Sequence, residues 1–187
     1  LPENLQTAVS KRQIHYLLGR QCAAFLLGEN ESLLQCRPTG EALWPVGVVG
    51  SITHTQGVAA AVVGSSDEWL GVGIDAERVV TSQRVEKLRA KVFREKEWSN
   101  VRAQSSWPDN VLFTAVFSAK ECIYKAYFGS VQKYFGFHQA EITAFNETGL
   151  IEATVDHSVI ANTRAPEQVR IRVGVEEDLV LTVAAIA

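Results

Sequence analysis

Three acidic residues and one lysine, placed in two distant segments, are the residues of this chain best suited to catalysis. Asp75 and Glu77 end the segment GVGIDAE, whose pattern predicts a β-strand, so both carboxylates leave the same face. Glu121 and Lys125 are four residues apart in the segment FSAKECIYKA, whose pattern predicts a helix, so they also share a face. If these faces meet, three carboxylates and an ammonium form a site for a hard divalent cation, with Mg²⁺ the first candidate, and for a phosphate-bearing substrate.

Each part of this constellation also has an ordinary structural interpretation. Asp75 and Glu77 can be solvated acids where a strand leaves the core, although two carboxylates at the end of a Gly-rich buried strand repel one another and lose hydration. Glu121 and Lys125 can be a surface pair worth only about 0.2–0.5 kcal/mol. Their neighbours in the sequence are apolar, however, and charges in an apolar helix need partners.

Further polar residues are candidates for binding an anion. Thr53 and His54 stand at the end of a predicted strand, where a hydroxyl and an imidazole can bind phosphate, but a histidine at such a place is also common in an ordinary turn. Arg12 and Arg20 are eight residues apart on a predicted helix and form either a solvated basic face or an anion clamp. Arg37, in a loop containing proline and glycine, allows the same two interpretations.

The bulk composition limits the class of protein. The chain has 187 residues, of which 47% are hydrophobic and 21% charged, as in globular proteins. Its formal net charge of -3 argues against a dedicated nucleic-acid binder. Three cysteines without a CxxC pair predict reduced thiols in a cytoplasmic protein. No apolar run approaches the roughly 18 residues of a membrane span, so no transmembrane segment is expected.

The hydrophobic periodicity predicts an alternation of helices and strands. Helices are expected over residues 9–27, 82–101 and 111–128, and strands over 46–53, 57–64, 70–77, 140–145, 150–155, 169–175 and 179–186. The order is helix and then strands, twice over. This order indicates two α+β halves that meet near residues 71–77.

Three blocks, in this order, resemble the 4'-phosphopantetheinyl transferase superfamily, within the branch typified by enterobactin synthase component D. They are WPVGVVGSITH at residues 44–54, GVGIDAE at 71–77 and FSAKECIYKA at 117–126. The predicted first helix, with Arg12 and GRQCA at 19–23, also fits this branch. Each block alone is modest, but the ordered trio at this spacing is specific. The resemblance covers about residues 10–145.

The resemblance implies a fold and a reaction. The fold is a mixed α+β monomer of two similar halves, each a small, mainly antiparallel sheet on a long helix, related by a pseudo-twofold axis. Residues 1–71 would bind the nucleotide of coenzyme A, residues 72–187 would carry the metal site and catalytic helix, and the active site would lie between them. The enzyme would transfer phosphopantetheine from coenzyme A to a serine of an apo acyl, aryl or peptidyl carrier protein of a siderophore or other nonribosomal peptide pathway.

The resemblance also implies residue roles. Asp75, Glu77 and Glu121 would hold Mg²⁺, and Glu121 would take the proton of the carrier serine. Lys125 would contact the pyrophosphate and stabilise the leaving phosphate. The residues expected to bind coenzyme A are Arg12, Arg20, Arg37, Thr53, His54, Lys120 and Lys125.

Several alternatives remain open at the level of the sequence. The same acids suit a Mg²⁺-dependent hydrolase of coenzyme A-type pyrophosphates, and a non-catalytic nucleotide-binding or protein-binding module would show the same blocks. Oxygen ligands accept Mn²⁺ as well as Mg²⁺. Residues 78–98, which combine apolar and basic side chains, form either a docking face for an acidic carrier protein or an ordinary amphipathic surface helix.

Overall fold

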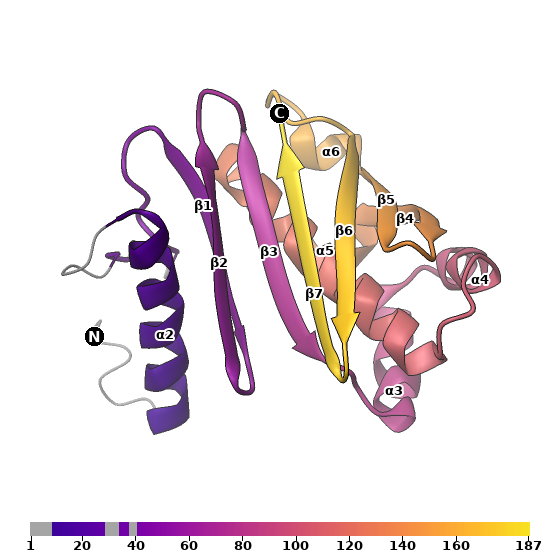
Figure 1. Ribbon diagram of the computed structural model, residues 1–187. Helices are drawn as coiled ribbons and strands as arrows, with labels where there is room; N and C mark the ends of the chain where they lie inside the picture. The colour runs from indigo at the N-terminus through magenta and orange to yellow at the C-terminus, as the bar shows by residue number, and fades with distance from the viewer. Residues whose placement is uncertain (1–8, 29–33, 38–40) are drawn as a thin grey trace.

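The computed structural model describes residues 9–28, 34–37 and 41–187, without the side chains of residues 10–12. The chain is a mixed α+β fold (Figure 1). The helices are α2 (Ser10–Leu26), α3 (Ser82–Val92), α4 (Glu95–Ala103), α5 (Asp109–Val131) and α6 (His157–Ile160), with a short 3-10 helix, η1 (Phe137–Gln139). The strands are β1 (Val48–Thr55), β2 (Val58–Ser65), β3 (Gly71–Arg78), β4 (Ala140–Asn146), β5 (Leu150–Val155), β6 (Gln168–Glu176) and β7 (Leu179–Ile186).

The larger sheet has five antiparallel strands in the order β3-β7-β6-β5-β4. Helix α5 crosses one face of this sheet, as Figure 1 shows, and packs on β3, β7 and β6. Strands β5 and β6 bury alternate residues, as their sequence pattern predicts. The inward residues, such as Ile151 and Ile171, join apolar side chains of α5 such as Phe113 in one core. This core fixes the position of α5 against the sheet.

The smaller sheet is the hairpin β1-β2, on which α2 packs. Strand β1 lies beside β3 but shares no backbone ladder with it. Instead, the hydroxyl of Ser51 accepts the amide N–H of Ile74 at 3.2 Å, and the hydroxyl of Thr53 accepts that of Ala76 at 3.0 Å. Side-chain oxygens of one sheet therefore satisfy the edge amides of the other.

Two glycines bring β3 against α5. A Cβ atom at Gly71 would collide with the backbone carbonyl oxygen of Ala126, and one at Gly73 with that of Cys122. A backbone atom cannot move aside as a flexible side chain can, so only glycine allows this close approach. The glycines of the first acidic segment thus place its carboxylates next to the helix that carries the second.

The predicted α+β class with antiparallel sheets is confirmed. Both halves have the expected plan of an antiparallel sheet on a long helix, α2 on the hairpin and α5 on the larger sheet, although they differ in size. The predicted boundary at residue 71 coincides with the first residue of β3. The division of the chain into two domains stays a prediction.

The predicted continuous helix over residues 82–101 is wrong, because two helices, α3 and α4, occupy this region. The backbone of Phe93 and Arg94 between them is extended. Phe93 is 3% exposed, and its ring packs edge-on against Trp98 at 4.9 Å and near Phe113 at 5.8 Å. Burial of this aromatic ring interrupts a segment whose polarity and periodicity favour helix.

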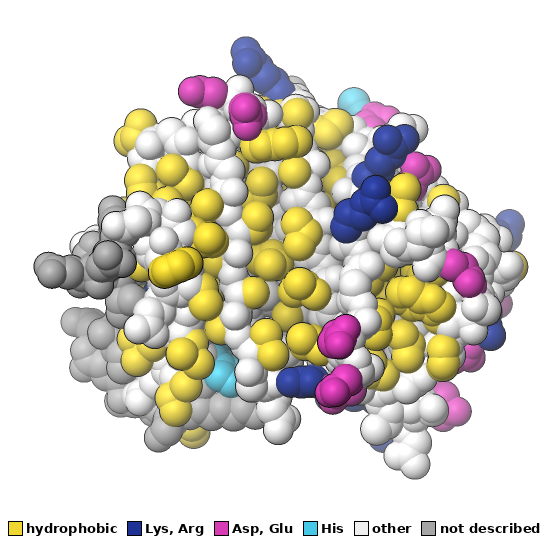
Figure 2. All heavy atoms as spheres, viewed as in Figure 1, with side chains coloured by type: hydrophobic (Ala, Val, Ile, Leu, Met, Phe, Trp, Pro, Cys, Tyr) yellow, Lys and Arg dark blue, Asp and Glu magenta, His cyan; other side chains and the backbone are white. Residues whose placement is uncertain are grey.

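The broad face opposite α5 is rich in apolar side chains along its strands (Figure 2). At one edge of the molecule, α2 exposes Phe25 and Leu18, and a shallow groove of about 440 Å³ lies between α2 and β2. Among the helices of the described residues, none is both long and apolar enough to cross a bilayer. The monomeric state and the cytoplasmic location expected from the sequence stay predictions.

Gly73→Ala should destabilise the protein, because the added methyl group meets backbone of α5. Overpacking in a well-packed core costs typically about 1–3 kcal/mol, and urea unfolding should show a loss at or above that range. Gly129→Ala is the matched control, since Gly129 lies in α5 with open space around the added methyl, and alanine is favoured in a helix by about 0.5–1 kcal/mol. Equal losses of stability in the two variants would show that the close approach of β3 to α5 does not require glycine at position 73.

Candidate active site

A buried carboxylate, Asp75, stands at the centre of the candidate site. It is 5% exposed and lies in β3, where α5 and β1 both approach. Lys125 donates from its ammonium to Asp75 Oδ1 at 2.7 Å and to the Ile74 carbonyl at 3.0 Å. Thr53 donates to Oδ1 at 3.2 Å, and Ser118 donates to Oδ2 at 2.9 Å. The strand and the helix that carry the predicted chemistry therefore meet in the fold.

The other two acids, Glu77 and Glu121, belong to the same electrostatic cluster. Desolvation and the charges of Asp75 and then Glu121 raise the pKa of Glu77 to about 7. Desolvation and the charge of Asp75 raise the pKa of Glu121. Within the described residues, no group of three Asp, Glu, His or Cys side chains is arranged so that it could hold a metal ion. The cluster is therefore a set of mutually repelling oxygen donors rather than a formed metal centre.

The side chain of Lys120 lies in the protein interior rather than at the acidic cluster. Its ammonium is fully buried, forms an ion pair with the equally buried Glu97 at 2.7 Å, and donates to the carbonyls of Val92 at 2.9 Å and Phe137 at 3.1 Å. Glu97 also accepts the amide N–H of Ile142 at 2.7 Å. The ammonium is thus directed at the protein interior, and its position gives no support to the predicted contact of Lys120 with coenzyme A.

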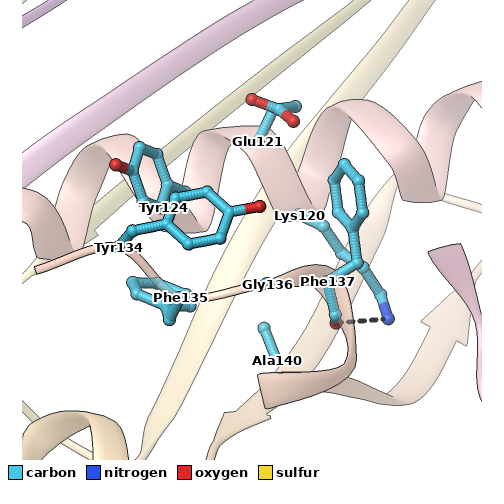
Figure 3. Close-up of a pocket in the computed structure, with 8 residues that line it drawn as sticks. All are labelled: Lys120, Glu121, Tyr124, Tyr134, Phe135, Gly136, Phe137 and Ala140. Atoms are coloured by element: carbon cyan, nitrogen blue, oxygen red, sulfur yellow. Dashed lines mark hydrogen bonds between the residues drawn. The ribbon is translucent and has the colours of Figure 1, made fainter. Parts of the chain in front are cut away.

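A small cavity of about 70 Å³ lies beside Glu121 (Figure 3). Its lining residues are Lys120, Glu121, Tyr124, Tyr134, Phe135, Gly136, Phe137 and Ala140. The ring of Tyr124 lies 5.8 Å from that of Tyr134 and 5.2 Å from that of Phe135. Sequence reasoning missed this wall, although the run YFGF at residues 134–137, a few residues after the helical segment, was the available signal. The cavity therefore offers, beside Glu121, an apolar surface that an uncharged part of a substrate can contact.

Thr53 and His54 point to different surroundings, because they are adjacent residues of β1. Thr53 is 3% exposed and donates to Asp75, so its side chain faces the protein interior, and its role beside His54 in phosphate binding stays a prediction. His54 is exposed and lies within the strand rather than in the predicted turn. Its ring lies 5.0 Å from that of His15 on α2, and desolvation, His15 and Lys125 lower the pKa of His54. Sequence reasoning overlooked His15, a histidine within the basic first helix.

The three predicted arginines occupy different environments. Arg20 is 6% exposed, and its guanidinium lies over the ring of Tyr16 at 4.9 Å. Arg37 is exposed and pairs with Glu41 at 3.0 Å. Arg12 belongs to α2, but its side chain lies outside the described residues. The contacts of these arginines with a nucleotide stay predictions.

Comparison with protein families agrees with both halves of the chain. The family description "4'-phosphopantetheinyl transferase superfamily" matches residues 71–184, which contain β3, α5 and all three acids of the cluster. The description "4'-phosphopantetheinyl transferase N-terminal domain" matches residues 1–64, which contain α2, β1 and most of β2.

Individual relatives are about a third identical to this chain over the aligned residues. The 4'-phosphopantetheinyl transferase Npt of Nocardia iowensis is 33% identical over 76% of this chain and 64% of its own length. The 4'-phosphopantetheinyl transferase PptT of Mycobacterium tuberculosis is 34% identical over the same shares. Enterobactin synthase component D of Salmonella typhi is 32% identical over 78% of this chain and 61% of its own length. The chain thus spans less than two thirds of the length of these relatives.

Lys120→Ala should strongly destabilise the protein, because it leaves the Glu97 carboxylate buried without its cation. Breaking a buried ion pair on one side typically costs about 3–5 kcal/mol, which urea unfolding would measure. Lys87→Ala, at an exposed position on α3, is the control and should change stability little. The double variant Lys120→Met/Glu97→Leu should recover part of the loss. A loss for Lys120→Ala no larger than that of the control would contradict this assignment.

Proposed function

Because this chain belongs to the 4'-phosphopantetheinyl transferase superfamily, we propose that it transfers the 4'-phosphopantetheine group of coenzyme A to a serine of an apo carrier protein. The products are the holo carrier protein and adenosine 3',5'-bisphosphate. The single observation that carries the proposal is the Asp75–Lys125 ion pair of 2.7 Å, which joins the two motif segments in one site. Relatives whose names state this transferase activity support it.

We infer that Asp75, Glu77 and Glu121 hold Mg²⁺ in this site after their side chains turn toward a common point, since they do not form a ligand set in the arrangement described above. All three side chains offer only oxygen, the donor that hard divalent cations prefer. Two of these carboxylates are penalised by desolvation and by like charge, and a dication would offset both costs. When bound, the cation supplies neutralisation of the charge on the pyrophosphate oxygens. The same donors accept Mn²⁺, so the inference covers both ions.

In the proposed reaction, Glu121 accepts the proton of the carrier serine hydroxyl, directly or through one water. The serine oxygen then forms a bond to the phosphorus that carries the pantetheine, and the bond from this phosphorus to the bridging oxygen breaks. Adenosine 3',5'-bisphosphate leaves with the bridging oxygen and its electron pair. Lys125, whose ammonium already lies at the cluster, stabilises the negative charge on this leaving phosphate.

The nucleotide end of coenzyme A is assigned to the N-terminal half. His54 is exposed on β1, the strand next to the acidic cluster, and is proposed to hold the 3'-phosphate. Arg12, Arg20 and Arg37 are proposed to contact the rest of the nucleotide, because a guanidinium presents several donors to phosphate oxygens. Coenzyme A would then lie between the hairpin and α5.

The proposed surface for the carrier protein is the basic side of α3. Among the apolar residues of the segment 78–98, Val92 and Phe93 are buried in the core, so these two are not available to a partner at the surface. The basic residues that remain exposed are Arg84, Lys87, Arg89 and Lys91. Opposite charge favours an acidic partner, which would be an acyl, aryl or peptidyl carrier protein of siderophore or other nonribosomal peptide synthesis.

Purified protein with coenzyme A and Mg²⁺ should add the mass of one phosphopantetheine group to at least one member of a panel of apo carrier proteins. Mass spectrometry measures this addition. Glu121→Gln, which removes the proposed base, should slow transfer by about 10²–10⁴-fold while coenzyme A still binds. Glu176→Gln, at an exposed position on β6, is the control. Consumption of coenzyme A without any carrier protein would instead indicate a pyrophosphate hydrolase, and no addition to any carrier would refute the proposal.

His54→Ala should weaken the binding of coenzyme A through its 3'-phosphate alone. Loss of a hydrogen bond to a charged group should raise the KM for coenzyme A about tenfold or more. Dephospho-coenzyme A lacks the 3'-phosphate, so its KM should change much less. His157→Ala, an exposed histidine paired with Glu167, serves as the control. An equal rise in KM for both substrates would show that His54 does not hold the 3'-phosphate.

A further inference from the structure

Three buried hydroxyl groups surround the carboxylate of Asp75. Thr53 comes from β1, Ser118 from α5 and Thr182 from β7, and they are 3%, 0% and 0% exposed. Thr182 lies directly opposite Asp75 in the β3-β7 register. None of the three hydroxyls faces solvent, so each must find its hydrogen-bond partners within the protein.

The directions of these hydrogen bonds follow from the number of protons. The Thr53 hydroxyl accepts the amide N–H of Ala76 at 3.0 Å and gives its one proton to Asp75 Oδ1 at 3.2 Å. Ser118 gives its proton to Asp75 Oδ2 at 2.9 Å. Ser118 then has no second proton, so Thr182 directs its one proton at the oxygen atoms of Ser118, the hydroxyl at 2.9 Å and the carbonyl at 3.0 Å, with the carbonyl of Asp75 farther away at 3.5 Å. Thr53 and Ser118 thus hold the two carboxylate oxygens directly, and Thr182 packs against Ser118.

These donors occupy most of the acceptor capacity of Asp75. An ionised carboxylate has about four lone-pair sites, two on each oxygen. Thr53 and Lys125 use the two sites on Oδ1, and Ser118 uses one site on Oδ2. By this count, one lone pair, on Oδ2, receives no donor from the described residues.

We propose that Thr53, Ser118 and Thr182 are positioning residues of the transfer site, which hold Asp75 so that one Oδ2 lone pair remains for a divalent cation. This inference rests on the proposed function. Thr182 is the most informative member, because it reaches the Asp75 side chain only through Ser118 and lies outside the three sequence blocks that carry the family resemblance. A strand near the end of the described chain thereby contributes to the geometry of the cation ligands.

Thr182→Val tests the inference, since valine has nearly the same shape but no hydroxyl. Mn²⁺ is the probe, and electron paramagnetic resonance of free Mn²⁺ measures its binding to the full chain in the presence of coenzyme A. Loss of one orienting hydrogen bond should raise the Kd of Mn²⁺ about two- to tenfold, and Thr182→Ser should restore it. The KM for the carrier protein should not change. If Thr182→Val does not fold, Ser118→Ala removes the next hydroxyl of the same chain and should give the same shift.

Thr114→Val is the matched control. Thr114 is equally buried in α5, but its hydroxyl accepts the amide N–H of Val80 and donates to the carbonyl of Asn110, away from Asp75. The Thr114→Val variant should have lower thermal stability but unchanged Mn²⁺ binding. The inference is overturned if Thr182→Val binds Mn²⁺ like the wild type, or if both variants weaken Mn²⁺ equally. If the wild type still transfers phosphopantetheine in either case, only the positioning role is overturned and the proposed function stands. A wild type that neither binds Mn²⁺ nor modifies any carrier protein refutes both the positioning role and the proposed function.

Discussion

The structure of this protein depends on the compensation of one buried negative charge, that of Asp75. Removing a carboxylate from water costs several kcal/mol unless ionic and hydrogen-bond partners replace the lost hydration. Here the partners are an ammonium and three hydroxyl groups, two in direct contact with the carboxylate and one behind them. They come from β1, α5 and β7, while Asp75 itself belongs to β3. The charge that suits the site for chemistry therefore also ties four elements of the fold together.

Helix α5 carries a second buried ion pair with a different task. Lys120 and Lys125 are five residues apart, but Lys120 pairs with Glu97 of α4 and Lys125 with Asp75 of β3. Glu97 in turn holds the amide of Ile142 in β4, so the first pair joins α4 and β4 to the helix. Because both pairs act on neighbouring turns, they fix the rotation of α5 about its own axis. That rotation turns the face of α5 that carries Glu121 toward the acidic cluster.

Much of this arrangement could be predicted from the sequence, and the failures have identifiable physical causes. Alternation of apolar residues gave the bounds of β5 and β7 correctly, since their inner faces are fully committed to the core. Lys120 and Lys125 looked alike, because their difference depends on Glu97, which no local pattern connects to the helix. Thr53 was expected to end a strand, with His54 in the turn that follows, whereas the strand continues to Thr55 and Thr53 faces Asp75. The helix break at Phe93 required knowledge of the core that receives its ring.

The seam between the two sheets has a mechanical consequence. Strand β1 meets β3 through the hydroxyls of Ser51 and Thr53, whereas neighbouring strands within each sheet are joined by backbone pairing. Parting the hairpin from β3 therefore breaks a few side-chain contacts and leaves both ladders intact. A ligand that enters between the two sheets would meet these side-chain contacts on one side and the close packing of β3 on α5 on the other. The seam next to Asp75 is therefore the place where we expect the two sheets to separate most easily.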